Sequence, residues 1–212
     1  MNNGSLLKAA VLTAVLVLLS VATWEFYVRS KGFDKSFDDD PALWADKRKM
    51  VYEPKDQATV MIGSSRIKFD LVISAWESMT GNHAIQLACV GSSPIPVLQN
   101  LADDKNFKGR LIVDVTEGLF FSTSPNNSSL PEKNIKYYKD QTPAQKASAA
   151  IDHLLESQLV FLDKDRLSLN ATLTELRIPS RTGVFEEPIF PPDFGRVKFD
   201  RQEYMTERFL TD

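Results

Sequence analysis

The chain has 212 residues, of which 43% are hydrophobic and 25% charged, and its formal net charge is −3. This is the composition of an ordinary globular protein, so wholesale disorder, a collagen-like chain and a polytopic membrane protein are excluded. The acidic balance implies no basic face, which argues against nucleic acid as a partner. One cysteine, Cys89, and two histidines, His83 and His153, exclude an internal disulfide and any cluster of imidazoles. No thiolate metal cluster can form either, and no other motif indicates a metal or nucleotide site, so we expect neither a metal nor a cofactor.

The N-terminal segment is long and apolar. Residues 9–24 carry no charge, and residues 6 and 7 extend the run because Lys8 can snorkel to the headgroups. A membrane-spanning helix needs about 20 apolar residues, and the aromatic residues near position 26 suit a membrane interface. Residues 1–28 are thus predicted to be a transmembrane signal anchor, with residues 6–28 in the lipid bilayer. A signal peptide cleaved near Ala22 is the alternative.

The orientation of this helix is inferred from the length of its leading tail. The charges on the two sides are nearly balanced, so the positive-inside rule alone does not decide. A first apolar segment behind a very short tail usually exports the remainder of the chain. We therefore expect a single-pass cytoplasmic (inner) membrane protein with its C-terminal body outside the cytoplasm, in the periplasm of a bacterial cell.

The first part of the body alternates strands and helices. Residues 29–56 are predicted to be a juxtamembrane linker and a short helix. Asp40 is the expected N-cap of this helix and Pro41 its first residue. The acidic run 38–40 is expected to be a solvated part of the linker. Apolar runs at 58–62, 84–90 and 110–115 predict strands, and residues 68–80 and 94–102 predict helices. Residues 57–121 therefore predict a βαβαβ unit with a parallel sheet.

The pattern changes after residue 121. Residues 122–134 are predicted to be a polar loop, and a capping box at Thr142 and Gln145 starts a long helix to about residue 161. A second helix is predicted for residues 163–176, so that residues 122–182 form a helical insert. Residues 183–195 predict an aromatic, proline-rich loop, and residues 200–212 the start of a C-terminal helix.

Small and polar residues follow each of the three predicted strands. The first strand is followed by Gly63-Ser64-Ser65-Arg66, the second by Gly91-Ser92-Ser93-Pro94, and the third runs into Asp114-Val115-Thr116. Parallel sheets bind ligands at the carboxyl ends of their strands, so these tips are the candidate site. Each motif alone is also an ordinary turn or N-cap sequence, and the information lies in their repetition on successive strands.

This layout resembles the SGNH (GDSL-type) hydrolase superfamily, and in particular its uncharacterised membrane-anchored bacterial members. That family has a Gly-Asp-Ser block after the first strand, a glycine after the second and an asparagine block after the third. The match covers about residues 58–121. The resemblance implies a three-layer α/β/α fold of the flavodoxin-like type with a parallel sheet. Here that fold is expected to be incomplete, to follow one transmembrane helix and to carry the helical insert.

The resemblance also implies site residues. Ser65 takes the place of the nucleophile, Gly91 that of an oxyanion amide donor, and Thr116 that of the asparagine whose side chain completes the oxyanion hole. Arg66 and Ser92 are candidate substrate-binding residues, since Arg66 can hold an anionic group. Ser64 replaces the aspartate of the motif, and no Asp-x-x-His block exists, so the catalytic base is unknown and not found in this chain.

Two functions are compatible with this pattern. The first is a membrane-anchored serine esterase or O-acyltransferase that acts on envelope carbohydrate or lipid, inactive in this form because the base is missing. The second is a non-catalytic envelope protein that keeps the fold for binding or scaffolding. We expect only three core strands, where a doubly wound sheet has about five, and so an incomplete or inactive SGNH-like protein. A five-stranded sheet within the chain would contradict this.

Overall fold

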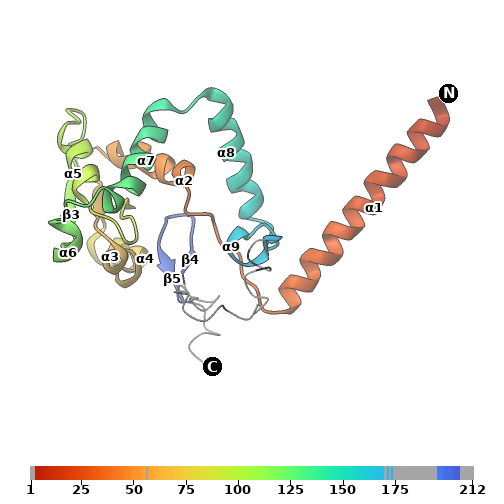
Figure 1. Cartoon of the computed structure of the whole chain (residues 1–212), viewed down its shortest axis with the longest axis horizontal. Coiled ribbons are helices and arrows are strands. Elements are labelled where there is room, and N and C mark those ends of the chain that lie inside the picture. The colour runs from red at the N-terminus through yellow and green to blue at the C-terminus, as the bar shows by residue number, and fades with distance from the viewer. Residues whose placement is uncertain (1–2, 56, 170, 172, 174–194, 206–212) are drawn as a thin grey trace, which may run out of the picture. The chain divides into compact units, whose positions relative to one another are not determined.

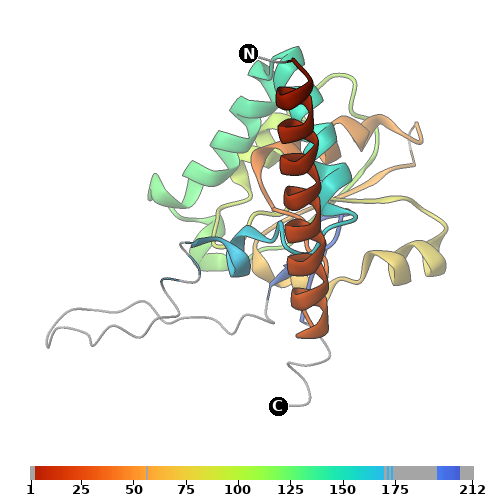
Figure 2. The same cartoon turned by 90° about the vertical axis from the view of Figure 1, so that its right-hand side faces the viewer.

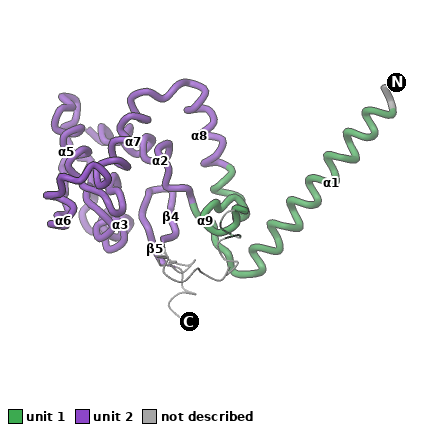
Figure 3. The backbone as a smooth tube through the Cα atoms, in the orientation of Figure 1, with its two compact units in different colours: residues 1–36, 155–179 green, residues 37–154, 180–212 purple. Residues whose placement is uncertain are grey.

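The computed structural model describes residues 3–55, 57–169, 171, 173 and 195–205. The chain divides into two compact units, which are coloured separately in Figure 3. Unit 1 consists of residues 1–36 and 155–179, and unit 2 of residues 37–154 and 180–212. Each unit is described by itself.

Unit 2 is built on a parallel three-stranded sheet. Its strands are β1 (Thr59–Ile62), β2 (Ala84–Gln86) and β3 (Arg110–Val113), in the order β2-β1-β3. Val60 of β1 lies opposite Ile85 of β2 and Leu111 of β3. The predicted mixed α/β class, with three strands in a parallel sheet, is confirmed for the described residues.

Both faces of the sheet are covered by apolar side chains from helices. On one face, Val60 and Ile62 pack with Trp44, Val97 and Leu101. These three come from α2 (Pro41–Lys49) and α5 (Ile95–Ala102), and the helix α7 (Asn126–Asp140) adds partly buried residues to the same cluster. On the other face, Met61 packs with residues of α3 (Ser65–Asp70) and α4 (Ile73–Thr80). Figure 1 labels these helices together with β3 of the sheet. The near-continuous apolar character of β1 reflects its burial on both sides.

Local sequence signals set several helix ends. Asp40 Oδ1 accepts hydrogen bonds from the amides of Ala42 and Leu43, both at 2.9 Å, so the predicted N-cap of α2 is confirmed. A 3-10 turn, η1 (Met50–Tyr52), continues α2. At the start of α8 (Pro143–Glu156), the amide of Thr142 donates to Gln145 Oε1 at 2.8 Å, and the amide of Gln145 donates to Thr142 Oγ1 at 3.3 Å. The predicted capping box is therefore present.

The helix predicted over residues 68–80 is two helices. α3 ends at Asp70, Leu71 is extended with ψ 111°, and α4 begins at Ile73. The amide of Ile73 donates to Gln202 Oε1 at 3.2 Å instead of to a carbonyl of the preceding turn. A tertiary contact from the far end of the chain therefore supports the break, and local periodicity could not show it. The strand predicted over residues 84–90 is likewise shorter, since β2 ends at Gln86.

The polar loop predicted for residues 122–134 was wrong. Most of it belongs to α7, which starts at Asn126 and contains Pro131. The carbonyl of Asn127 accepts from the amide of Ser93 at 2.7 Å, and the side chain of Asn134 donates to Cys89 Sγ at 3.5 Å. Packing against α2 and α5 thus stabilises a helix whose first turn has weak intrinsic propensity. A short helix, α6 (Glu117–Phe120), precedes it.

The C-terminal helix predicted from residue 200 was wrong in its described part. The strands β4 (Arg196–Val197) and β5 (Glu203–Tyr204) pair antiparallel, and Arg201 has a left-handed φ of 67° in the turn between them. The rest of that prediction, residues 206–212, lies outside the described residues. So do residues 183–194 of the predicted aromatic loop.

Unit 1 contains the N-terminal helix and a short folded segment. α1 (Asn3–Ser30) is one continuous helix, which Figure 2 shows as a single rod. Its part from Ser5 to Ser30 has a mean hydropathy of 2.3 in its most apolar window, none of which is buried. It is long and apolar enough to cross a membrane, a test that a signal sequence also passes. Of the helix predicted for residues 163–176, α9 (Lys164–Leu167) is present, Ser168 interrupts it, and residues 169, 171 and 173 are again helical, whereas residues 170, 172 and 174–182 lie outside the described part.

Candidate functional site

The ends of the three parallel strands lie side by side. The amide of Cys89, just after β2, donates to the carbonyl of Gly63, just after β1, at 3.2 Å. The amide of Asp114, just after β3, donates to the carbonyl of Ile62 at 2.9 Å. The segments that begin at Gly63, Cys89 and Asp114 therefore leave the sheet at one edge, where such sheets bind their ligands.

Gly63 allows the first and third tips to approach closely. A Cβ atom at this position would lie 2.7 Å from Asp114 Cβ and 2.8 Å from Ile67 Cγ2. These distances are shorter than side chains tolerate, so only glycine fits between the end of β3 and the first turn of α3. The glycine in the Gly-Ser-Ser motif is thus explained by packing.

The two serines of the motif have different environments. Ser64 is 1% exposed, and its hydroxyl has no hydrogen-bond partner among the described residues. Ser65, the first residue of α3, is partly exposed and lines a pocket of about 660 Å³. Ser65, and not Ser64, is therefore the serine that a ligand in this pocket can reach.

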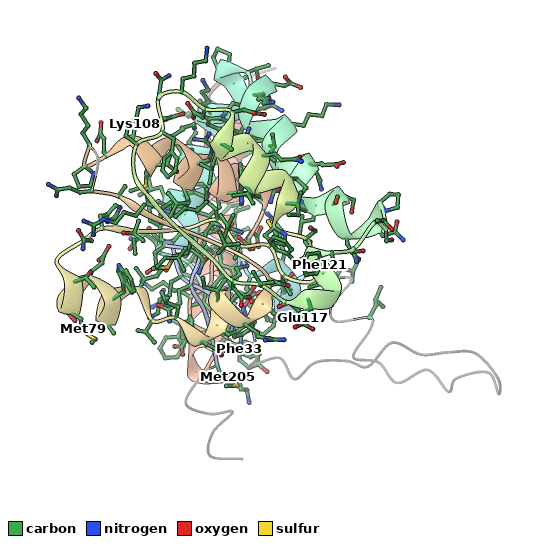
Figure 4. All side chains as sticks on the ribbon, turned by 90° about the vertical axis from the view of Figure 1, so that its left-hand side faces the viewer. Phe33, Met79, Lys108, Glu117, Phe121 and Met205 are labelled. Atoms are coloured by element: carbon green, nitrogen blue, oxygen red, sulfur yellow. The ribbon has the colours of Figure 1, made fainter. Side chains whose placement is uncertain are left out.

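The Ser65 pocket combines an apolar wall with charged groups. Phe69, Val90 and Met205 supply the wall, and Met205 is labelled in Figure 4. The other described lining residues are Arg66, Asp70, Gly195 and Glu203. Arg66 is exposed and can hold an anionic or strongly polar group at the rim. The pocket is therefore formed by α3, by the segment that follows β2, and by the hairpin of β4 and β5 with its flanking residues, which we call the C-terminal hairpin.

The segment after β2 contributes fewer residues to the Ser65 pocket than the sequence suggests. Gly91 is exposed and has a φ of +64°, and no atom lies within 4 Å of where its Cβ would be. Ser92 is 3% exposed, and its hydroxyl donates to the carbonyl of Val90 at 3.1 Å. Val90 lines the Ser65 pocket, whereas Gly91 and Ser92 are not among its described lining residues.

The third tip borders a second groove. Thr116 precedes α6, and its hydroxyl is buried with no hydrogen-bond partner among the described residues; the same is true of Asp114 Oδ2. Asp114 lines a groove of about 680 Å³ together with Arg66 and Trp76. Met79 also lines it and is 86% exposed, so this groove is open. Figure 4 labels Met79 at the edge of the molecule. The structure thus brings Ser65 together with Arg66 and Val90, whereas Thr116 is not among the described lining residues of either cavity.

A buried cluster of four charged side chains lies beside the Ser65 pocket. Lys68 of α3 is fully buried, and its Nζ contacts Asp39 and, at 2.8 Å, Glu203 Oε1. Arg201 is also buried and is paired with Asp39. Glu203 belongs both to this cluster and to the pocket. The cluster therefore joins the segment before α2, the helix that begins at Ser65 and the C-terminal hairpin.

The cluster changes the ionisation of its two carboxyl groups in opposite directions. Burial favours a higher pKa for Asp39, but the charges of Arg201 and Lys68 outweigh it and lower this pKa to about 2. For Glu203, burial outweighs the attraction of Lys68 and raises the pKa. The expectation that the acidic run 38–40 is a solvated linker was therefore wrong for Asp39.

Sequence reasoning missed this cluster for a physical reason. Its members are far apart in the chain, and charged residues are usually solvated, so no local pattern marks them as buried. Among the members of the cluster, only Asp39 lies in a recognisable sequence feature, the acidic run 38–40. That run does not indicate which basic residues pair with it.

Neither histidine lines the Ser65 pocket. His83 Nδ1 lies 2.8 Å from Glu77 Oε1, and the carbonyl of His83 accepts from the amide of Thr59, the first residue of β1. His83 is therefore at the amino end of the sheet, opposite the strand tips. His153 Nδ1 lies 3.3 Å from Asp46 Oδ2, and its ring packs on Phe199 with centroids 5.8 Å apart. A hydrogen bond from His153 is the main reason why the pKa of Asp46 is lowered to about 2.

Among the described residues, no group of three or more histidine, cysteine, aspartate or glutamate side chains is arranged to hold a metal ion. Comparisons with protein-family models, with curated proteins and with solved structures find no match to this chain. The resemblance to the SGNH superfamily therefore depends on the motifs of the sequence itself.

Proposed function

We propose that this chain is a membrane-anchored, SGNH-like protein of the cell envelope that binds an acylated carbohydrate or lipid in the Ser65 pocket. In this proposal α1 is the anchor, and the body lies outside the cytoplasmic membrane. The main support for the proposal is the composition of the pocket, in which an apolar wall adjoins Ser65 and Arg66. An acyl chain suits the wall, and the polar part of the same ligand suits the hydroxyl and the guanidinium.

The positions of the histidines favour binding over catalysis. A serine hydroxyl needs an adjacent base to become a nucleophile. The chain has two histidines, and both form contacts elsewhere, His83 with Glu77 and His153 with Asp46. Neither is therefore available to Ser65 in this structure, which supports the non-catalytic alternative.

A serine esterase or O-acyltransferase is the second candidate, and one observation favours it. Glu203 lines the same pocket as Ser65, and its burial raises its pKa. A carboxylate with a raised pKa is a stronger base than an ordinary one. In this alternative Glu203 accepts the Ser65 proton while the serine oxygen attacks the carbonyl carbon of an ester. The alcohol then leaves with that proton from Glu203, and the acyl group stays on Ser65 until water or a second alcohol takes it.

Photo-crosslinking tests the binding proposal on the full chain in membranes. The probe is a palmitate analogue that carries a diazirine and an alkyne, and the labelled residues are assigned by mass spectrometry. We expect labelling at Phe69, Val90 or Met205 in addition to α1. The Val90→Trp variant should lose the pocket labelling, whereas Val115→Trp should keep it, because Val115 has a similar exposure, 45% against 40%, and is not among the described residues of the pocket.

Fluorophosphonate labelling separates the two candidates. Labelling that disappears in Ser65→Ala and persists in Ser64→Ala would establish the esterase or acyltransferase. An unlabelled protein that still gives the pocket crosslinks supports the binding function. The absence of pocket crosslinks in a folded protein contradicts the proposal.

A further inference from the structure

The end of α1 is joined to a distant part of the chain within unit 1. The carboxylate of Glu25 accepts hydrogen bonds from the backbone amides of Val160 and Phe161 at 3.0 Å. Arg29, which is paired with Glu25, donates to the carbonyl of Gln158 at 2.6 Å. These contacts hold residues 158–161 against the last turns of α1.

Two further side chains, Lys35 and Arg166, fix the neighbouring residues. Lys35 Nζ donates to the carbonyl of Ser157 at 2.8 Å. Arg166 of α9 donates to the carbonyl of Asp34 at 3.2 Å, and its guanidinium lies 4.7 Å from the centre of the Phe33 ring. Arg166 is itself buried and paired with Asp163 at 2.8 Å. Residues 155–169 are therefore a folded part of unit 1, which we call the α1-bound segment.

The contacts with Glu25 determine how deep the α1-bound segment lies in the membrane. Glu25 lies between Trp24 and Tyr27, whose rings stack with centroids 5.5 Å apart. Tryptophan and tyrosine at the end of a spanning helix lie at the level of the lipid headgroups. Because Glu25 bonds directly to the amides of Val160 and Phe161, these amides lie at the same level.

Protein groups bond much of the backbone of this segment. A backbone amide or carbonyl that leaves water without a partner costs free energy, so partners within the protein favour a position in the lipid interface. Here side chains from α1 and the residues after it bond two amides and two carbonyls of residues 157–161. The amides of Gln158 and Leu159 bond the carbonyl of Leu155.

Large apolar side chains of unit 1 point outward around this segment. Leu155 is 41% exposed, Leu169 75% and Leu173 51%. Residues 159–162, which lie between Leu155 and Leu169 in the sequence, are also apolar, but Val160 is buried and the other three are only partly exposed, so the exposed apolar surface consists of the three leucines. Exposed leucines on a folded segment at headgroup level are the arrangement of an interfacial membrane contact.

We propose that the α1-bound segment is a second membrane contact, which inserts its exposed leucines into the lipid interface beside the end of α1. This inference rests on the proposed role of α1 as the anchor. It adds a surface that fixes unit 1 against the bilayer at two places, where a single helix would leave the chain free to rotate.

Fluorescence quenching tests this on the full chain in lipid nanodiscs. Bimane is attached to a single cysteine at Leu169→Cys in a Cys89→Ala background, and lipids carry a doxyl quencher at a shallow or a deep acyl position. Asp165→Cys is the matched control in the same segment, and Leu18→Cys reports on α1. We expect strong quenching at position 169 by the shallow quencher, several-fold less at position 165, and strongest quenching at position 18 by the deep one.

The results distinguish the α1 anchor from the second membrane contact. Quenching at position 18 with no more quenching at 169 than at 165 overturns the second contact and leaves the anchor intact. No quenching at position 18 overturns the anchor and this inference with it. Adding Glu25→Ala, which removes the acceptor for Val160 and Phe161, should reduce the quenching at 169 and leave that at 18 unchanged.

Discussion

Arg201 holds Asp39 with two nitrogens of its guanidinium group. Its Nε donates to Asp39 Oδ1 at 2.6 Å and its Nη2 to Asp39 Oδ2 at 3.0 Å. The same guanidinium donates to the carbonyls of Gln86 at 2.9 Å and Ala88 at 3.1 Å, at the end of β2. One buried side chain from the C-terminal hairpin thus fixes the segment before α2 and the edge of the sheet beside the Ser65 pocket.

Removing Arg201 should therefore destabilise unit 2 strongly. Arg201→Met leaves Asp39 partly buried without its bidentate partner and leaves two carbonyls without a donor. Breaking a buried ion pair from one side costs about 3–5 kcal/mol. Urea unfolding followed by circular dichroism measures this loss. Arg110→Met, a change at an exposed arginine on β3, is the control and should change the stability by less than about 0.5 kcal/mol. Equal effects of the two changes would refute the structural role of Arg201.

The same pair predicts a dependence of stability on pH. The pKa of Asp39 is about 2 in the folded protein, below the value of about 3.9 in an unfolded chain. Ionised Asp39 therefore stabilises the fold above about pH 4, and this contribution is lost as the pH falls through 4 towards 2. Unfolding free energies measured between pH 6 and pH 2.5 should fall more steeply for the wild type than for Asp39→Asn. The exposed Asp103→Asn change should keep the wild-type slope.

A methyl group at Gly63 should disturb the edge of the sheet. Gly63→Ala places its Cβ 2.7 Å from Asp114 Cβ, which forces the two strand tips apart. Overpacking of this kind costs about 1–3 kcal/mol. The matched change Gly118→Ala, in α6, meets no atom within 4 Å and should stabilise the protein by up to about 1 kcal/mol. Thermal unfolding that shows the same shift for both variants would contradict the close approach.

The histidines supply a further test of the site. If Ser65 reacts with a fluorophosphonate, His83→Ala and His153→Ala should leave the rate of labelling unchanged, because neither histidine lines the pocket. His153→Ala should still lower the stability, since it removes a hydrogen-bond partner of Asp46. A loss of labelling in either variant, with the fold intact by circular dichroism, would assign that histidine as the base.

The sequence predicts those parts of the fold that local chemistry determines. Asp40 caps α2 and Thr142 begins a capping box because both signals act within three residues. The strands β1 and β3 are predicted by short apolar runs that end at turn residues. The break between α3 and α4 and the helix α7 depend instead on Gln202 and on packing with α2, which no local pattern contains.

The same dependence on distant residues explains which parts of the candidate site the sequence indicates and which it does not. The sequence indicates Ser65 and Arg66 because they follow a strand, and both line one pocket. It does not indicate Glu203, which reaches that pocket from a hairpin more than a hundred residues away and is held there by buried Lys68. It also suggests that Ser92 faces a ligand, whereas the hydroxyl of this residue is bonded to Val90.

If the Ser65 pocket holds an acyl group, substitutions of Arg66 and Val90 should both change its labelling. The measurement is photo-crosslinking of the full chain in membranes with the diazirine palmitate analogue, assigned residue by residue. Arg66→Ala should reduce and Val90→Trp should abolish labelling of Phe69 and Met205, while Arg110→Ala and Val115→Trp leave it unchanged. Labelling of the pocket that persists in Val90→Trp, or labelling confined to α1 in the folded wild-type protein, would contradict the proposal.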